Sequence, residues 1–224
     1  MSDSLPRVDA SANVCSSRSG PHARAVLTLL AATFALTGCL SIGGDRAELA
    51  VYAPQVTITA DPAWPRLDRT LAIAEPNTST ALDSNRIAVR PTPAQLQVYA
   101  GAIWSDTAPA LVQSALVDAL GDSGRFRAVV RPIDGIASDL LLRLDLRQFE
   151  AVYGDDADRP TVVVELQATL LDPRGNRVLA TRTFRTEKTS ADEDLPEVIA
   201  AFDIALEATA TAMTPWLLEK APPN

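Results

Sequence analysis

Histidine and cysteine are scarce in this chain of 224 residues, and their scarcity excludes several classes of protein. The single histidine, His22, argues against a His-rich metal site and against a His-dependent hydrolase. Two cysteines, Cys15 and Cys39, leave little scope for a disulfide framework. The chain also lacks the GxxxxGK(S/T), GxGxxG, HExxH and GxSxG motifs. We therefore expect no enzymatic activity, no metal and no dissociable cofactor.

Basic residues are also in short supply. The chain has 20 Lys and Arg against 28 Asp and Glu, a formal net charge of −8. Residues 1–38 carry +1, so residues 39–224 carry −9. A surface with this balance repels phosphate backbones, and we expect no nucleic-acid partner. Apolar residues at 47% and charged residues at 21% are ordinary for a globular protein, so most of the chain should fold.

One uncharged run lies near the start of the chain. Residues 25–36 read AVLTLLAATFAL, which is too short to cross a membrane, where about 20 apolar residues are needed. The length suits the apolar region of a secretory signal, with Arg18 and Arg24 as its positive flank. We predict a signal peptide over residues 1–38, a tether over 39–48 containing a Gly pair, and a folded domain over 49–220.

The end of this run, Leu36-Thr37-Gly38-Cys39, resembles the lipobox of bacterial lipoproteins. The resemblance implies that the signal is removed before Cys39, that its thiol carries diacylglycerol, and that the new amino terminus receives an acyl chain such as palmitate. Two or three acyl chains anchor a protein stably, at about 0.8 kcal/mol per buried CH₂. The residue after Cys39 is Leu40, and not the Asp that resembles an inner-membrane retention signal. This difference favours a location on the periplasmic side of the outer membrane in a Gram-negative bacterium. The alternative for Cys39 is a buried cysteine in a core helix.

Periodicity predicts the elements of the domain. Short strands are expected within 49–59, 70–74, 87–90 and 126–130, and a helix with apolar residues at intervals of three and four over 104–120. Ser105 or Asp106 should cap this helix and Gly121 should end it. Alternating residues over 137–185 predict a three-stranded meander with a hairpin turn at 172–176.

A second helix should cover the meander. Asp194 and Glu197 resemble a capping box, apolar residues follow at helical spacing to Trp216, and Pro215 should kink or end the helix. The predicted fold is α+β, with a mostly antiparallel sheet and two long α-helices packed on one face.

Residues 82–104 carry a family resemblance. The stretches LDSNRIAVRP, QLQVYAG and Trp104 look like the ABC-type transport auxiliary lipoprotein component family, whose members read "NRI…R", then "QLQ-x-Y", then a Trp. Later stretches agree, including GRF at 124–126 and ATLLDPRGNRVLATRTF at 168–184. The resemblance covers about residues 50–218. Val89 and Val98 depart from it, because the family often has an aromatic residue at both positions.

The resemblance implies a non-catalytic role in the cell envelope. Such lipoproteins work beside ABC transporters whose substrate-binding subunits are of the mammalian-cell-entry type, and these systems move lipids or other hydrophobic molecules. The implied partners are that subunit and the ABC permease and ATPase complex, and some relatives self-assemble. The alternative from the residues is a lipoprotein that itself carries a hydrophobic ligand between sheet and helices.

Four residues are candidates for partner contact: Asn85, Arg86, Tyr99 and Trp104. For Asn85 and Arg86 the structural alternative is a turn residue and an arginine paired at the sheet edge. For Tyr99 and Trp104 it is a place in the core. Asp155, Asp156 and Asp158 do not have the spacing of a calcium-binding loop and are expected at a solvated hairpin tip.

Overall fold

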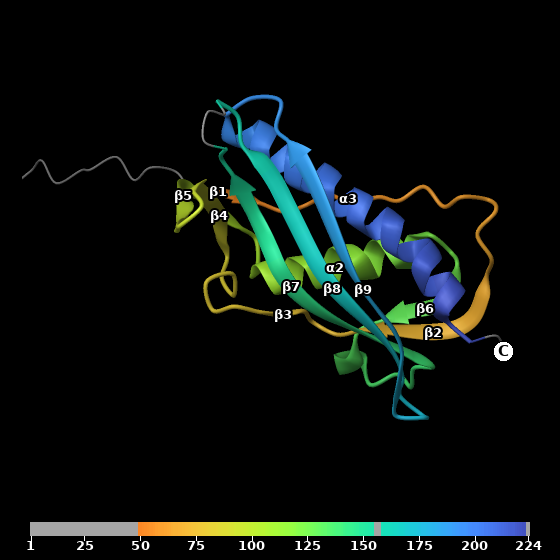
Figure 1. Ribbon diagram of the computed structural model, residues 1–224. Helices are drawn as coiled ribbons and strands as arrows, with labels where there is room; N and C mark the ends of the chain where they lie inside the picture. Colours follow the sequence, from red (N-terminus) through yellow and green to blue (C-terminus); the bar gives the residue numbers. More distant parts are fainter. Residues whose placement is uncertain (1–48, 155–157, 223–224) are drawn as a thin grey trace, which may run out of the picture. The chain divides into compact units, whose positions relative to one another are not determined.

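The computed structural model describes residues 49–154 and 158–222 (Figure 1). The predicted signal peptide, the tether, and Leu36, Thr37, Gly38 and Cys39 lie outside the described residues, as do Asp155 and Asp156. Residues 48–224 form a compact unit that has its own hydrophobic core. The elements are β1 (Ala50–Tyr52), β2 (Leu67–Ile73), β3 (Asn77–Thr78), β4 (Arg86–Thr92), β5 (Gln95–Trp104), α2 (Ala108–Asp122), β6 (Phe126–Val130), the 3₁₀ turn η1 (Pro132–Asp134), β7 (Leu140–Val152), β8 (Thr161–Asp172), β9 (Arg177–Thr189) and α3 (Leu195–Lys220).

The strands form one sheet of mixed direction. The long strands β7, β8 and β9 are antiparallel neighbours, as is the pair β4 and β5. Strands β2, β3 and β4 instead run parallel to β7, β6 runs parallel to β2, and β1 runs parallel to β5. The prediction of a mostly antiparallel sheet therefore holds for β7 to β9 and for the β4–β5 pair, and it is wrong for the other pairings of the amino-terminal half of the domain. Strands β2, β3 and β4 lie one after another along the same edge of β7, so this part of the chain runs beside β7 in one direction without turning back.

The meander predicted over 137–185 is confirmed as β7, β8 and β9. Its hairpin turn lies at the predicted residues 172–176, between β8 and β9. The Asp172 carboxylate stabilises the turn by accepting the N–H groups of Arg174 and Gly175 at 3.0 and 2.9 Å. These bonds lower the pKa of Asp172, the Gly175 bond most. A Cβ on Gly175 would lie 2.7 Å from an Asp172 oxygen, so a larger residue there would displace the carboxylate that holds the turn.

Both helices cover the same face of the sheet (Figure 1). Helix α3 packs on β8 and β9, while α2 packs on β6, β2 and α3. The inward residues of β7 and β8 alternate as predicted, and Leu142, Leu166 and Phe202 have no exposed surface. Helix α3 is long and apolar enough to cross a membrane, with a mean hydropathy of 1.2 over an 18-residue window, but its apolar side is buried against this sheet.

The first helix begins later than the sequence indicates. Trp104 ends β5, and α2 starts at Ala108 after the N-cap Thr107, so the predicted start at Trp104 and the caps Ser105 or Asp106 are wrong. The helix ends at Asp122, one residue past Gly121. The extended segment predicted at 49–59 contains only the three-residue β1.

Helix α3 starts as predicted and ends later. Asp194 is its N-cap, although its side chain makes no capping hydrogen bond. Pro215 lies inside the helix, which continues to Lys220. A proline within a helix removes one backbone hydrogen bond, and the surrounding residues Met213, Trp216 and Leu217 are buried in the core. Their packing holds the helical path past Pro215.

Asp203 provides a test of how α3 meets the loop after β1. Its carboxylate accepts the N–H of Gln55 at 3.2 Å, and burial raises its pKa. A raised pKa in the folded state means that the charged form opposes folding above that pKa, and that stability rises as pH falls through it. We expect Asp203→Asn to be more stable than the native chain at pH 7.5, and the advantage to shrink toward pH 4.5.

Urea denaturation at the two pH values measures this difference. Glu207→Gln removes an exposed carboxylate from the same helix and is the matched control. A pH-independent difference between Asp203→Asn and the native chain would refute the assignment.

Candidate interaction surface

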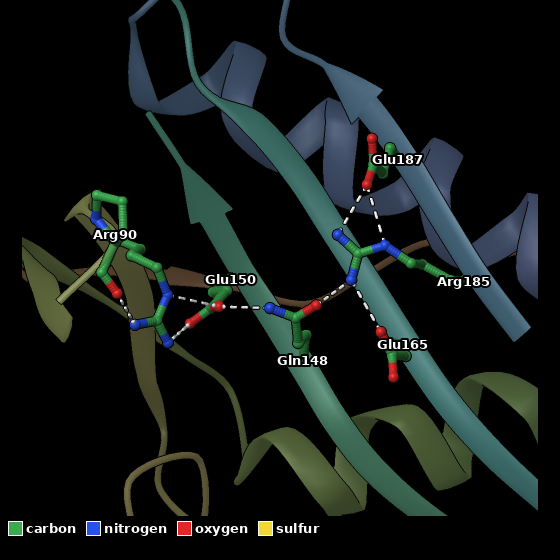
Figure 2. A network of polar contacts seen from close by, with 7 residues as sticks. Arg90, Gln148, Glu150, Glu165, Arg185 and Glu187 are labelled. Atoms are coloured by element: carbon green, nitrogen blue, oxygen red, sulfur yellow. Dashed lines mark hydrogen bonds and ion pairs between the residues drawn. The ribbon is translucent and has the colours of Figure 1, made fainter. Parts of the chain in front are cut away.

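The face of the sheet opposite the helices carries a connected set of polar side chains. One ion pair of this set joins Arg90 of β4 to Glu150 of β7 (Figure 2). Arg90 Nε and Nη2 donate to Glu150 Oε1 and Oε2, each at 2.9 Å, and Nη1 donates to the carbonyl of Pro93 at 3.2 Å. The Glu150 side chain is 2% exposed, against 28% for Arg90. The hydrogen bond to Glu150 raises the pKa of Arg90, which favours the charged guanidinium.

The contacts continue across the neighbouring strands. Gln148 Nε2 donates to Glu150 Oε1 at 3.0 Å, and Gln148 Oε1 accepts from Arg185 of β9 (Figure 2). Arg185 also pairs with Glu165 of β8 at 2.8 Å and with Glu187 at 2.7 Å, and these bonds raise its pKa. We call the six residues the polar ladder: Arg90, Gln148, Glu150, Glu165, Arg185 and Glu187. It links β4, β7, β8 and β9.

A bulge in β7 places two members of the ladder. Leu146 pairs with Leu166, but the next pair is Gln148 with Glu165, so Arg147 is the additional residue. The bulge reverses the alternation, because one extra residue moves every later side chain to the opposite face. Phe149 then enters the core, and Gln148 and Glu150 reach the outer face. Sequence alternation alone, continued from Leu146, would put Gln148 and Glu150 inside, which is why they were not candidates.

The charged groups of the polar ladder on this face are paired with one another. Each carboxylate of the ladder accepts a hydrogen bond from a guanidinium or an amide. Within the described residues no group of three or more His, Cys, Asp or Glu side chains could hold a metal ion. The outer face also presents exposed Arg143, Arg147 and Thr183. A face that carries both charges and that neither α2 nor α3 covers can align a polar partner surface.

The predicted contact residues Asn85 and Arg86 lie at the start of β4, beside the end of β5. The Asn85 carbonyl accepts the N–H of Trp104 at 2.8 Å, and Arg86 pairs with Ile103 in the strand register. Both side chains are exposed. Arg86 forms no ion pair within the described part of the chain, so the predicted edge pairing is not observed.

Trp104 and Tyr99 lie in β5, and they differ in burial. Trp104 is 1% exposed and contacts Phe149 and Phe202 with ring centroids 5.5 and 5.1 Å apart. Its place is therefore in the core, as the structural alternative predicted. Tyr99 is partly buried at the edge of the core, and burial together with the Tyr153 hydroxyl raises its pKa. Partner contact stays a prediction for Asn85, Arg86 and Tyr99.

Comparison with known proteins identifies the family. A family model described as ABC-type transport auxiliary lipoprotein component matches residues 49–214. The chain belongs to this family. Members are auxiliary lipoproteins of transport systems, which indicates a location in a bacterial envelope.

Solved structures agree with the membership. A crystal structure of a Xanthomonas campestris protein shares 40% identity and a TM-score of 0.71, covering 76% of this transport auxiliary lipoprotein and 96% of that chain. A second crystal structure, of an uncharacterized protein, has a TM-score of 0.60 at 14% identity, covering 76% and 99% of the two chains, and shares the fold. An uncharacterized protein of Bradyrhizobium diazoefficiens is 29% identical over 174 residues, 78% of this chain. The chain spans 46% of the length of that relative.

Proposed function

We propose that this protein is a lipid-anchored periplasmic component of an ABC transport system of the mammalian-cell-entry type, which moves lipids or other hydrophobic molecules through the envelope. It acts by docking and assembly. The observation that carries the proposal is a family match over residues 49–214 that directly follows a lipobox-like segment ending in Cys39. The proposed location is the periplasmic side of the outer membrane.

The docking role draws support from the uncovered face of the sheet. Within the described residues both helices pack on the other side of the sheet (Figure 1). The exposed members of the polar ladder, Arg185 and Glu187, and exposed neighbours such as Thr183 therefore lie on a face that these helices do not cover. Arg185 and Glu187 supply charges of opposite sign there, which favours a partner surface with complementary polar groups. The proposed partners are the mammalian-cell-entry-type subunit and the permease and ATPase complex, and a second copy of the chain is a further candidate.

The interior between sheet and helices bears on the alternative role as a carrier. Trp104, Phe149 and Phe202 fill the centre, with Phe149 and Phe202 centroids 4.8 Å apart. These side chains occupy the space between sheet and helices that a carried ligand would need. Mass spectrometry of gently purified protein distinguishes the roles, because a stoichiometric bound lipid would favour the carrier.

Replacing Cys39 by serine tests the anchor. Serine has no thiol for diacylglycerol, so we expect loss of radiolabelled palmitate and loss of membrane retention after fractionation. Cys15→Ser is the matched control, because Cys15 lies within the predicted signal and should affect neither result. Continued labelling and unchanged retention of Cys39→Ser would refute the anchor.

A photo-crosslinking residue at Thr183 tests the docking face. Thr183 is exposed on β9 and lies on the same side as Arg185. We expect it to crosslink to a transporter subunit in cells, whereas the same probe at Ile204, exposed on α3, should not. Crosslinks from Ile204 and none from Thr183 would contradict this assignment and indicate that the helical side docks.

A further inference from the structure

Two ends of the sheet expose large apolar side chains. At one end these are Leu49, Val51, Leu96 and Val98, which we call the proximal patch. At the other are Ile133, Ile136 and Val178, the distal patch. The register separates them: Leu141 at the start of β7 lies beside the β8–β9 turn, while Val152 at its end pairs with Arg90, just before the β4–β5 turn.

The proximal patch gathers around the tip of the β4–β5 hairpin. Strand β1 runs parallel to β5, so Leu49 at its start points toward the same end of β5 as this tip. Arg86 pairs with Ile103 and Ala88 pairs with Val98, so a step of two residues on β4 lies opposite a step of five residues on β5. The additional residues of β5 form a bulge around Gly101, whose φ is 70°. Val98 therefore lies roughly 7 Å along the sheet from Ile103, the partner of Val51.

The chemistry of this hairpin suits a lipid surface. Residues 91–104 contain no charged side chain, although the chain as a whole is −8. Residues 92–98 are all exposed. The distal patch, by contrast, lies among ionised groups, including the Arg174–Asp139 pair at 2.8 Å and the Arg177–Asp172 pair at 3.4 Å. Near the proximal patch, Arg90 is paired with buried Glu150, and Arg86 lies beside Ile103 on the far side from the hairpin tip. Charged groups oppose entry into a bilayer, so the uncharged hairpin enters the interface more readily than the distal patch does.

We infer that the proximal patch rests in the headgroup region of the membrane that anchors the protein. The inference depends on the proposed anchor at Cys39, because residues 39–48 can span at most roughly 35 Å whatever their conformation. A strand as long as β7 spans roughly 44 Å. A domain whose long strands stand perpendicular to the membrane therefore has its proximal patch at the bilayer and its distal patch away from it.

Insertion is shallow for a physical reason. Residues 95–98 of β5 pair with β4 on one side, and among the described residues no strand pairs with their other edge. Unpaired backbone groups are costly in hydrocarbon but can bind water and headgroups at the interface. The glutamines at positions 95 and 97 alternate with Leu96 and Val98 and can do the same. The contact thus orients the domain and supplements the anchor.

An environment-sensitive fluorophore at position 98 tests the inference. Residues 40–224 contain no cysteine, so Val98→Cys provides the only thiol in that chain, which holds the complete folded unit. An amino-terminal histidine tag captures the chain on phosphatidylethanolamine and phosphatidylglycerol vesicles that contain a nickel lipid. This capture replaces the natural anchor, so the result does not depend on acylation of Cys39. We expect emission to rise at least about twofold and shift to the blue, because the probe leaves water.

Val178→Cys in the distal patch is the matched control and should not respond, although Val178 is 58% exposed. A probe at Val51 should respond too, and Leu96→Ser with Val98→Ser should lower its response. Thermal melting confirms that each labelled chain is folded. A silent Val98 probe, or a stronger response at Val178, would overturn the inference. So would a Val98 response that rises with protein concentration in the absence of vesicles, since this indicates a second copy as the occupant.

Discussion

Replacing Arg90 by methionine is expected to lower the free energy of unfolding by about 3–5 kcal/mol, because it leaves a buried carboxylate without its counter-charge. Glu150 is 2% exposed at its side chain and receives two hydrogen bonds from Arg90. Gln148 alone would then face the charge, through one bond of 3.0 Å. Urea denaturation of residues 40–224 at neutral pH measures the loss.

A second substitution separates the charge from the packing. In Arg90→Met with Glu150→Leu both charges are gone, and we expect most of the stability to return, since apolar replacements of buried ion pairs are often neutral or stabilising. Arg147→Met is the matched control: this arginine is 45% exposed, its pair with Glu165 is 3.6 Å long, and the loss should stay below about 1 kcal/mol. A double variant no more stable than Arg90→Met would show that the role of the pair is not mainly to neutralise Glu150.

Phe202→Ala should destabilise the domain by about 3–5 kcal/mol, the range for large aromatic deletions in a core. Phe202 has no exposed surface, and its ring contacts those of Trp104 and Phe149 at 5.1 and 4.8 Å. It thereby joins α3 to β5 and β7, and its loss opens a cavity at the junction of helix and sheet. Denaturation followed by tryptophan emission reports it, because Trp104 lies in the same cluster.

Two variants on α3 calibrate this result. Phe202→Leu keeps most of the volume and should cost clearly less than Phe202→Ala. Ile204→Ala, two residues away and 47% exposed, should change stability by less than about 0.5 kcal/mol. If Phe202→Ala cost no more than Ile204→Ala, the aromatic cluster would not be the junction described.

Hydrophobic alternation predicted the half of the sheet in which neighbours in sequence are neighbours in space. Leu140, Leu142, Leu144 and Leu146 point to the core as their spacing indicates, and the turn at Asp172 and Gly175 joins β8 to β9. Local chemistry suffices there because a hairpin needs only its own turn and a matching period.

The strand β5 was missed because its local signals conflict. Gln95 and Gln97 are polar, Gly101 bends the strand, and the spacing from Trp104 to Ala108 looks helical although Ser105, Asp106 and Thr107 form a loop. What holds Trp104 in a strand is its pairing with Tyr52 and its contact with Phe149, residues distant in sequence.

By itself the sequence determined the lipobox-like segment, the long meander, the two helices and the family resemblance, since each depends on residues close together in the chain. Tertiary structure decided the parallel pairing of β2, β3 and β4 along one edge of β7, the burial of Glu150 beneath Arg90, and the separation of two apolar patches to opposite ends of the sheet. These features depend on which strands meet and on a bulge at Arg147. Such pairings are set by the packing of the whole core, and no local period encodes them.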